Sequence, residues 1–402
     1  MAMVLAAVAA IYAVRPSSAE PMSRTQARQR AEALSALGQT LFSDPRLSAS
    51  GRLSCSSCHD PAHAFAQSNS RSVQLGGKDM ADPGVRAVPS LKYLQAVPQF
   101  TEHFFDSEDE ADESIDNGPT GGLTWDGRAD RGAGQARIPL LSPFEMGNTN
   151  AKDVARRALA AGYGSPLAAI YGRDAVEDPN AVFHGILKAL EVYEQAWRTF
   201  YPYSSKYDAY LAGKAVLTPT EALGLRLFED PEKGNCASCH ISEPANDGEP
   251  PQFTDYGLIA VAAPRNPDIP ANADPAYYDL GLCGPLRTDF LGRADYCGLF
   301  RTPSLRNVAT RKVFFHNGVF HSLKDAVTFY ATRDTDPGHW YPKLPDGQIA
   351  IYNDLPARYR ANINMDPPFG GKPGDEPRLN DKEIDAIVAF LGTLTDGWTN
   401  SK

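Results

Sequence analysis

Long apolar segments are missing from almost all of this sequence. After the first twenty residues, no uninterrupted apolar run is long enough to cross a bilayer, and the mean hydropathy of the 402 residues is −0.36. A multi-span membrane protein is therefore excluded. The repeated alternation of apolar and polar residues that builds a large sheet is also missing. Because 42% of the residues are hydrophobic, we expect a globular, mainly α protein with long irregular loops.

Positive charge is scarce, with 39 Lys and Arg against 49 Asp and Glu and a net charge of −10. This balance counts against nucleic acid as a partner and permits a basic protein partner. No Lys or Arg precedes the apolar segment of MAMVLAAVAAIYAVRPSSAE. Small residues up to Ala19 nevertheless follow that segment, so residues 1–20 are predicted to be a secretory signal, with a single uncleaved anchor as the alternative. We expect no other membrane contact.

Cysteine is rare, and four of the six cysteines lie in two copies of Cys-x-x-Cys-His. In this pattern two thiols add across the vinyl groups of one haem, and the adjacent histidine supplies the proximal nitrogen to iron. A redox Cys-x-x-Cys or a chance match is a poor alternative for two copies. We therefore expect two covalently bound c-type haems, one on Cys55, Cys58 and His59 and one on Cys236, Cys239 and His240. Such attachment is made outside the cytoplasm, which favours export to the periplasm.

The remaining cysteines, Cys283 and Cys297, enclose a short segment rich in glycine and proline. In an oxidising compartment a disulfide is the natural inference. We expect this bond to be structural and not catalytic.

Each haem motif follows the same pattern, which indicates an internal repeat. Leu-Gly-x-x-Leu-Phe-x-Asp-Pro occurs at residues 37–45 and again at 223–231. We predict two cytochrome c-like domains over 23–205 and 206–398, each with a helix that leads into a haem-attachment loop. Helices are also predicted over 151–159, 181–200 and 381–394 from their apolar spacing, and Tyr201-Pro202-Tyr203 marks the linker.

The second axial ligand of each iron decides what the haems can do. Methionine would make an electron-transfer haem, but Met365 is the only one in the second unit. Tyr330 is the alternative there, since a phenolate would stabilise ferric and higher states. From spacing alone, Tyr330 is better explained as an aromatic residue on the core face of a helix.

The first iron is expected to have an open position. His63 is too close in sequence to His59 to reach the opposite face of the ring. Peroxide cleavage at an open iron needs a group that takes a proton from one oxygen and returns it to the other, and Glu145 or Gln135 could serve. Glu145 is equally well explained as a surface or helix-capping residue.

Several stretches, in this order along the chain, carry a family resemblance. They are LFSDPRLSASGRLSCSSCHDPAHAF, the segment WDGRA that begins at Trp125, the Gln-x-x-x-Pro and Glu-Met-Gly that follow, LFEDPEKGNCASCH, and FRTPSLRNVATRKVFFHNGVFHSLKDAVTFY. Together they resemble the bacterial di-haem cytochrome c peroxidase family, and within it the branch that includes MauG and MbnH. The resemblance spans nearly the whole chain after its N-terminal segment.

The resemblance implies a role for each matched residue. Trp125 matches the tryptophan that lies between the two haems and mediates charge sharing. Pro139 would pack over the open face of the peroxide-reactive haem, Glu145 would be its acid/base, and Gln135 a hydrogen-bonding partner. Tyr330 matches the axial tyrosine of the MauG-like branch, a position that is methionine in conventional peroxidases.

Two departures from the family pattern concern the calcium site and the route by which oxidising equivalents leave the protein. The family calcium site between the domains uses an asparagine side chain where this chain has Tyr93, and a proline carbonyl where it has Val313. Both changes weaken the expectation of calcium. MauG has a surface-side tryptophan where this chain has Gly234 and Asn235. The exit route of MauG therefore cannot be assumed for this chain.

Three functions remain for comparison. The leading hypothesis is a periplasmic di-haem enzyme that uses hydrogen peroxide to form a high-valent, bis-ferryl-like state and oxidises a tryptophan of a secreted partner protein by long-range electron transfer. The alternative is a cytochrome c peroxidase that reduces peroxide with electrons from a small cytochrome or cupredoxin. A non-catalytic di-haem electron carrier would need two six-coordinate irons.

Overall fold

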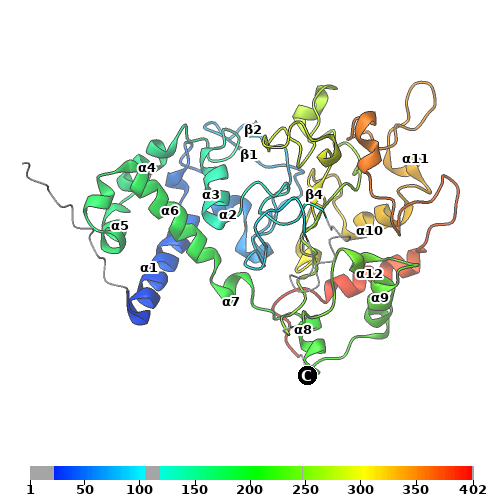
Figure 1. The fold of residues 1–402 in the computed structure, drawn as a ribbon, viewed down its shortest axis with the longest axis horizontal. Coiled ribbons are helices and arrows are strands. Elements are labelled where there is room, and N and C mark those ends of the chain that lie inside the picture. The colour runs from blue at the N-terminus through cyan, green and yellow to red at the C-terminus, as the bar shows by residue number, and fades with distance from the viewer. Residues whose placement is uncertain (1–21, 105–117, 247, 401–402) are drawn as a thin grey trace, which may run out of the picture.

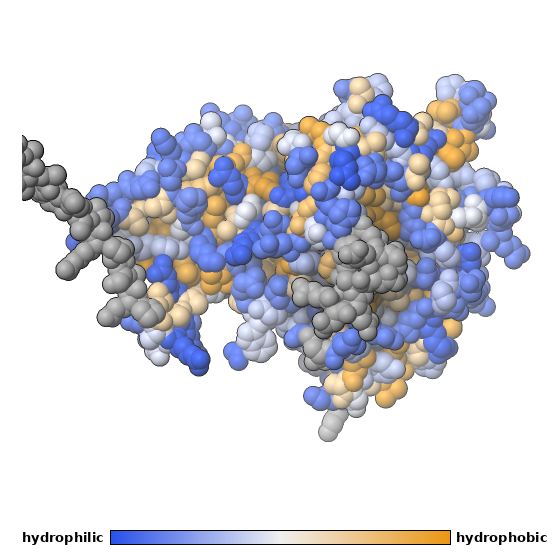
Figure 2. All heavy atoms as spheres, viewed as in Figure 1, coloured by the Kyte–Doolittle hydropathy of each residue, from blue (hydrophilic) through white to orange (hydrophobic). Residues whose placement is uncertain are grey.

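The structure is a computed structural model that describes residues 22–104, 118–246 and 248–400. The predicted signal or anchor, residues 1–20, lies outside the described residues. None of the helices within the described ranges has the length and apolar character that crossing a bilayer requires. On the face drawn in Figure 2, hydrophilic side chains predominate and hydrophobic ones form small, separate patches.

Helices dominate the fold and the strands are very short, so the prediction of a mainly α protein with long irregular loops is confirmed. The helices are α1 (Arg24–Phe42), α2 (Cys55–Cys58), α3 (Gly132–Leu141), α4 (Ala151–Ala160), α5 (Gly164–Tyr171), α6 (Pro179–Glu194), α7 (Trp197–Phe200), α8 (Lys206–Leu211), α9 (Pro219–Glu229), α10 (Leu323–Thr332), α11 (Pro337–Trp340) and α12 (Asp381–Gly392). Two antiparallel pairs of strands complete it, β1 (Leu75–Gly76) with β2 (Asp82–Pro83) and β3 (Leu258–Ile259) with β4 (Phe300–Arg301).

The N-terminal half is built on the crossing of α1 and α6 (Figure 1). Its apolar core draws on residues between Leu34 and Phe200. A methyl group at Gly38 of α1 would collide with the backbone carbonyl of Ala189 in α6. Glycine therefore lets the two helix backbones approach closely, which explains why the first Leu-Gly-x-x-Leu-Phe pattern contains it.

The C-terminal half repeats this crossing with α9 and α12 (Figure 1). Here Gly224 of α9 faces the backbone carbonyl of Ala386 in α12, and the core draws on residues between Tyr207 and Leu394. The two cores thus share no residue and are separated between residues 200 and 207. This separation supports the domain boundary that we propose at 205/206.

The helix predicted over 181–200 is interrupted, which corrects the sequence-based expectation. Helix α6 ends at Glu194, and Ala196 takes an extended conformation before the short helix α7. The break turns the ring of Phe200 into the core, where it lies 4.3 Å from Phe65 and 5.1 Å from Tyr193 between ring centroids. Tertiary packing thus overrides the helical periodicity of this segment.

A third, smaller apolar cluster lies in the irregular part of the C-terminal half. It includes Leu258, Leu282 and Tyr296. Cys283 and Cys297 belong to the same cluster and are joined by a disulfide. The bond ties together a loop that has little regular secondary structure of its own.

Candidate active site

The first Cys-x-x-Cys-His motif forms one helical turn and presents its histidine. Cys55 and Cys58 begin and end α2, and His59 follows directly. The Nδ1 of His59 donates to the carbonyl of Phe65 at 3.0 Å, because a carbonyl can only accept. This bond leaves Nε2 as the nitrogen available to iron. Burial lowers the pKa of His59 to about 4, so the ring is neutral as a ligand must be.

The second motif has the same arrangement. Cys236 begins a turn of 3₁₀ helix, and His240 donates from Nδ1 to the carbonyl of Phe253 at 2.9 Å. The two accepting residues, Phe65 and Phe253, both have φ of 54°, in the left-handed region that few phenylalanines adopt. Such shared strain indicates that the loop is shaped to orient the histidine.

A second repeated motif, missed in the sequence reasoning, supports both loops. Residues 89–91 and 303–305 both read Pro-Ser-Leu. The serine hydroxyl donates to the carbonyl of Ala64 in the first half at 2.5 Å and to that of Gln252 in the second half at 2.6 Å. Each acceptor immediately precedes the phenylalanine that holds the histidine. The signal was readable from the sequence as a further internal repeat.

Tyr330 lines the cavity of the second haem motif. Cys236, Cys239 and His240 line the same cavity, and Tyr330 reaches it from α10. The phenol ring stacks on Phe315 at 5.7 Å and on Phe369 at 5.1 Å between centroids, which fixes its orientation.

Met365 is placed differently. It is 48% exposed and is not among the residues that line the cavity. Its sulfur accepts a hydrogen bond from Nη2 of Arg333 at 3.2 Å. The methionine considered as an alternative ligand is therefore engaged elsewhere.

Polar groups on the wall of this cavity fit the propionates of a haem. Burial lowers the pKa of Arg301 to about 10, and no carboxylate pairs with it within the described ranges. The Nε2 atom of His316 is buried and has no hydrogen-bond partner. Both residues line the cavity. A buried cation and an orphaned ring nitrogen call for an anionic, hydrogen-bonding group, so the residues present fit a propionate-bearing haem.

Trp125 lines the same cavity and is 8% exposed. Its indole N–H donates to the carbonyl of Ala87 at 2.8 Å, and the Ala87 N–H donates to the carbonyl of His316 at 2.7 Å. Two residues after Ala87, the carbonyl of Pro89 acts on the His59 ring. The indole is thus held against backbone that belongs to the surroundings of both haem motifs.

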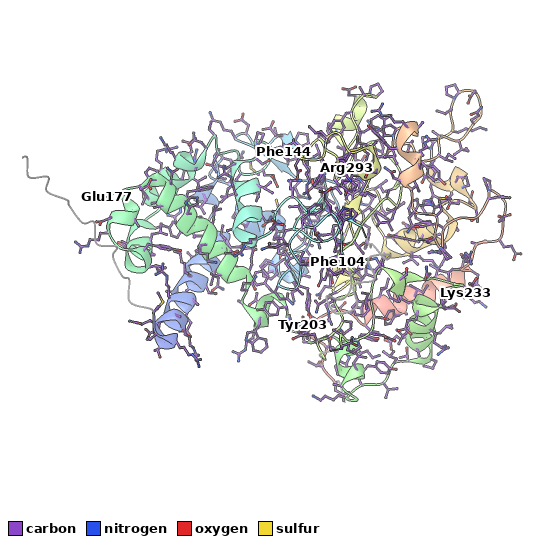
Figure 3. The ribbon with its side chains drawn as sticks, viewed as in Figure 1. Phe104, Phe144, Glu177, Tyr203, Lys233 and Arg293 are labelled. Carbon is purple, nitrogen blue, oxygen red and sulfur yellow. A yellow bond between two sulfur atoms is a disulfide. The ribbon has the colours of Figure 1, made fainter. Side chains whose placement is uncertain are left out.

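Gln135, Pro139 and Glu145 come from one segment. Gln135 and Pro139 lie on α3, and Glu145 lies in the turn that follows. The Glu145 carbonyl accepts from the N–H of Gly77, next to β1, and Phe144 marks this position in Figure 3. The segment therefore stands where α3 meets the β1–β2 pair.

The Glu145 carboxyl lies close to the first haem motif. Burial raises its pKa above the ordinary value, opposed by the neighbouring Ser142 hydroxyl and Arg128 guanidinium. Burial raises the pKa of Cys58 to about 12, and the charge of Glu145 adds to this shift. The structure thus brings Glu145 to the attachment cysteines of the first motif and Tyr330 to those of the second.

The residues at the family calcium position do not fit calcium. Within residues 22–104, 118–246 and 248–400, no group of three acidic, histidine or cysteine side chains could hold a metal ion, so the ligands at this position would have to be other oxygens. Tyr93 points its hydroxyl to Asp396 at 2.7 Å, and the carbonyl of Val313 accepts from Nε of Arg311 at 3.2 Å. Calcium prefers six to eight oxygen ligands, but here the Tyr93 hydroxyl also accepts from the N–H of Tyr203 at 3.1 Å, and the Val313 carbonyl is bonded to Arg311.

Known proteins match this chain over most of its length. A family model described as di-haem cytochrome c peroxidase matches residues 32–216. Methylamine utilization protein MauG of Paracoccus denitrificans (strain Pd 1222) is 33% identical over 379 residues, which cover 92% of this chain and 90% of the relative.

Two solved structures agree with the sequence relatives. The diheme peroxidase BthA from Burkholderia thailandensis E264 superposes with a TM-score of 0.80 at 40% identity, covering 90% of this chain and 86% of that one. A MauG-like protein associated with microbial copper homeostasis gives a TM-score of 0.62 at 26% identity, covering 94% and 91%. The family carries two c-type haems and acts with peroxide. This chain belongs to the di-haem cytochrome c peroxidase family.

Proposed function

We propose that the chain is exported to the periplasm and oxidises a tryptophan of a secreted partner protein. Peroxide reacts on the Glu145 side, and oxidising equivalents pass by way of Trp125 to the Tyr330 side before they leave for the partner. Once bound, the haems supply the iron chemistry that cleaves peroxide and holds the oxidising equivalents. The observation that carries this proposal is the place of Tyr330 in the cavity of the second haem motif.

Tyr330 supports the proposal through the chemistry of its oxygen. A phenolate is a harder, more electron-donating ligand than a thioether and favours the more oxidised states of iron. The stacked rings of Phe315 and Phe369 hold the phenol in one orientation. The second site would then store an oxidising equivalent, whereas a site with methionine would serve as an entry port for electrons.

Glu145 is suited to moving a proton. Its raised pKa keeps the carboxyl protonated over a wider range of pH than an exposed glutamate. A buried carboxyl that holds its proton more readily than an exposed glutamate can take a proton from one peroxide oxygen and give it to the other. Pro139 and Gln135 lie on the helix that leads into the same turn, where they would limit water and donate a hydrogen bond.

Trp125 is suited to carrying charge between the two sites. Its indole is buried, lines the second cavity and is fixed by the hydrogen bond to Ala87. The adjacent Asp126 is locked between Arg86 and Arg128 at 2.7 and 2.6 Å. A ring held this firmly needs little reorganisation when it gains or loses an electron.

The test is a Tyr330→Met variant of the holoprotein, with Phe315→Leu as the matched control that removes a stacking ring and keeps the phenol. After hydrogen peroxide is added, we expect a near-infrared charge-transfer band in the wild type and in the control. We expect no such band in Tyr330→Met. The same band in Tyr330→Met would refute the role of Tyr330.

The partner is tested separately by mass spectrometry. Wild-type holoprotein and peroxide should oxidise a tryptophan of a secreted protein encoded beside this one, and Tyr330→Met should not. If a redox titration of the wild type shows two widely split haem potentials, the proposal fails and the peroxidase that draws electrons from a small cytochrome or cupredoxin replaces it.

A further inference from the structure

We infer that the guanidinium of Arg311 replaces the interdomain calcium ion, so that this protein needs no calcium. The inference concerns the junction between the two halves and does not rest on the proposed function.

Arg311 joins backbone from both halves of the chain. Its Nε donates to the carbonyl of Val313 at 3.2 Å, and its Nη2 donates to the carbonyl of Val88 at 3.2 Å. Val88 precedes Tyr93 in the N-terminal half, whereas Val313 belongs to the C-terminal half. The calcium ion of the family would bridge the same two halves through the position of Tyr93 and the carbonyl of Val313, and here Arg311 brings its positive charge to that Val313 carbonyl.

The position of Arg311 is interior and next to both haem motifs. Its charge acts on the His59 ring, and it lines the cavity that contains His240 and Tyr330. No carboxylate pairs with Arg311 among the residues that the structure describes. Its hydrogen-bond partners are the carbonyls of Val88 and Val313, and the second of these is the carbonyl expected to bind calcium.

Tyr93 also takes part in a junction that is complete without a metal. Its hydroxyl donates to Asp396, and the guanidinium of Arg306 lies over its ring at 4.7 Å. Asp396 in turn accepts from Nζ of Lys92 at 2.8 Å and from Asn307 at 2.8 Å. The Asp396 carboxylate is thus saturated by protein donors.

The Arg311 guanidinium leaves no favourable place for a divalent ion. Arg306 is paired with Asp208 and Lys92 with Asp396, whereas no carboxylate of the described residues compensates the charge of Arg311. An added calcium ion at the Val313 carbonyl would have to displace the Arg311 guanidinium or lie against it, and like charges at such short range repel strongly inside a protein. The side chains that surround the position therefore exclude the ion and supply its charge.

The first experiment compares wild-type holoprotein as purified with the same protein after treatment with EGTA and dialysis. We expect no stoichiometric calcium by elemental analysis of the protein as purified, and an unchanged melting temperature and haem spectrum with EGTA or with added CaCl₂. One calcium ion per chain, or a melting temperature that falls with EGTA and recovers with CaCl₂, would overturn the inference.

The second experiment asks whether Arg311 supplies the charge. Arg311→Gln should lower the melting temperature by roughly 5 °C, and CaCl₂ should recover part of that loss because the Val88 and Val313 carbonyls are released. Arg301→Gln is the matched control, because it removes another buried guanidinium from the same cavity wall. CaCl₂ should not restore the melting temperature of this variant.

A third variant keeps the inference falsifiable if Arg311→Gln does not fold. Arg311→Lys retains the positive charge, so it should fold and show no response to CaCl₂. A folded Arg311→Gln that ignores calcium, or an Arg311→Lys that requires it, would contradict the replacement.

Discussion

Asp126→Asn is expected to lower the free energy of unfolding, because Asp126 forms the ion pairs next to Trp125. The Asp126 side chain is fully buried, and its Oδ2 atom accepts from Nη1 of Arg86 at 2.7 Å and from Nη1 of Arg128 at 2.6 Å. Its Oδ1 accepts from the Thr124 hydroxyl at 2.6 Å. The amide of asparagine keeps the shape and removes the charge that compensates both guanidinium groups.

The pKa of Asp126 and the usual cost of breaking a buried ion pair set the expected loss of folding free energy. Burial alone would raise the pKa of Asp126, but the charges of Arg86 and Arg128 outweigh it and hold the pKa at about 2, below the usual 3.8. A lowering of this size corresponds to roughly 2 kcal/mol of folding free energy at neutral pH. Breaking a buried ion pair on one side costs about 3–5 kcal/mol. The loss should therefore fall between about 2 and 5 kcal/mol.

The stabilisation that Asp126 contributes should depend on pH in a defined direction. Because the folded pKa is lowered, the stabilisation is complete above pH 3.8 and is lost as the pH falls towards 2. Denaturant unfolding of the holoprotein, followed by circular dichroism at about pH 7 and about pH 3, should show a difference between wild type and variant that shrinks in acid.

The control is Glu32→Gln. Glu32 is 63% exposed and pairs at 2.9 Å with Arg28, which is 82% exposed, so its loss should cost less than about 1 kcal/mol. A loss of less than about 1 kcal/mol for Asp126→Asn at neutral pH, or one that does not shrink in acid, would refute the reasoning.

Two further predictions concern the peroxide side and the disulfide. Glu145→Gln should slow the reaction with peroxide by about 10²–10⁴-fold in stopped-flow measurements. Since burial raises the pKa of Glu145 above 4.5, the wild-type rate should vary with pH above that value and the variant rate should not; equal pH profiles would speak against its acid/base role. Replacing Cys283 and Cys297 together by serine opens a loop of sequence separation 14 and should lower the free energy of unfolding by about 3 kcal/mol. Unchanged denaturation curves would contradict a structural role.

The haem motifs and the helix before each were predictable because their signals are local. The Cys-x-x-Cys-His spacing carries its own chemistry, and the repeated Leu-Gly-x-x-Leu-Phe pattern marks the same helix twice. The reason for the glycine was not visible, because the backbone that touches Gly38 and Gly224 lies far away in the sequence.

Long-range contacts explain what sequence reasoning missed. The break after Glu194 depends on a place for Phe200 in a core that the linear sequence does not display. Tyr203 lies between α7 and α8, where the chain crosses from one half to the other (Figure 3), and its ring packs on Tyr93 at 5.2 Å. The departures at Tyr93 and Val313 could be read as the loss of a calcium site, but the compensating contacts of Arg311 needed coordinates.

The most direct test of charge sharing is near-infrared spectroscopy of Trp125→Phe after peroxide. The account predicts that the variant binds both haems and reacts with peroxide but lacks the charge-transfer band of the wild type, because the indole that lines the second cavity is gone. A band of equal intensity in Trp125→Phe would show that the two sites share oxidising equivalents without this residue and would contradict the account.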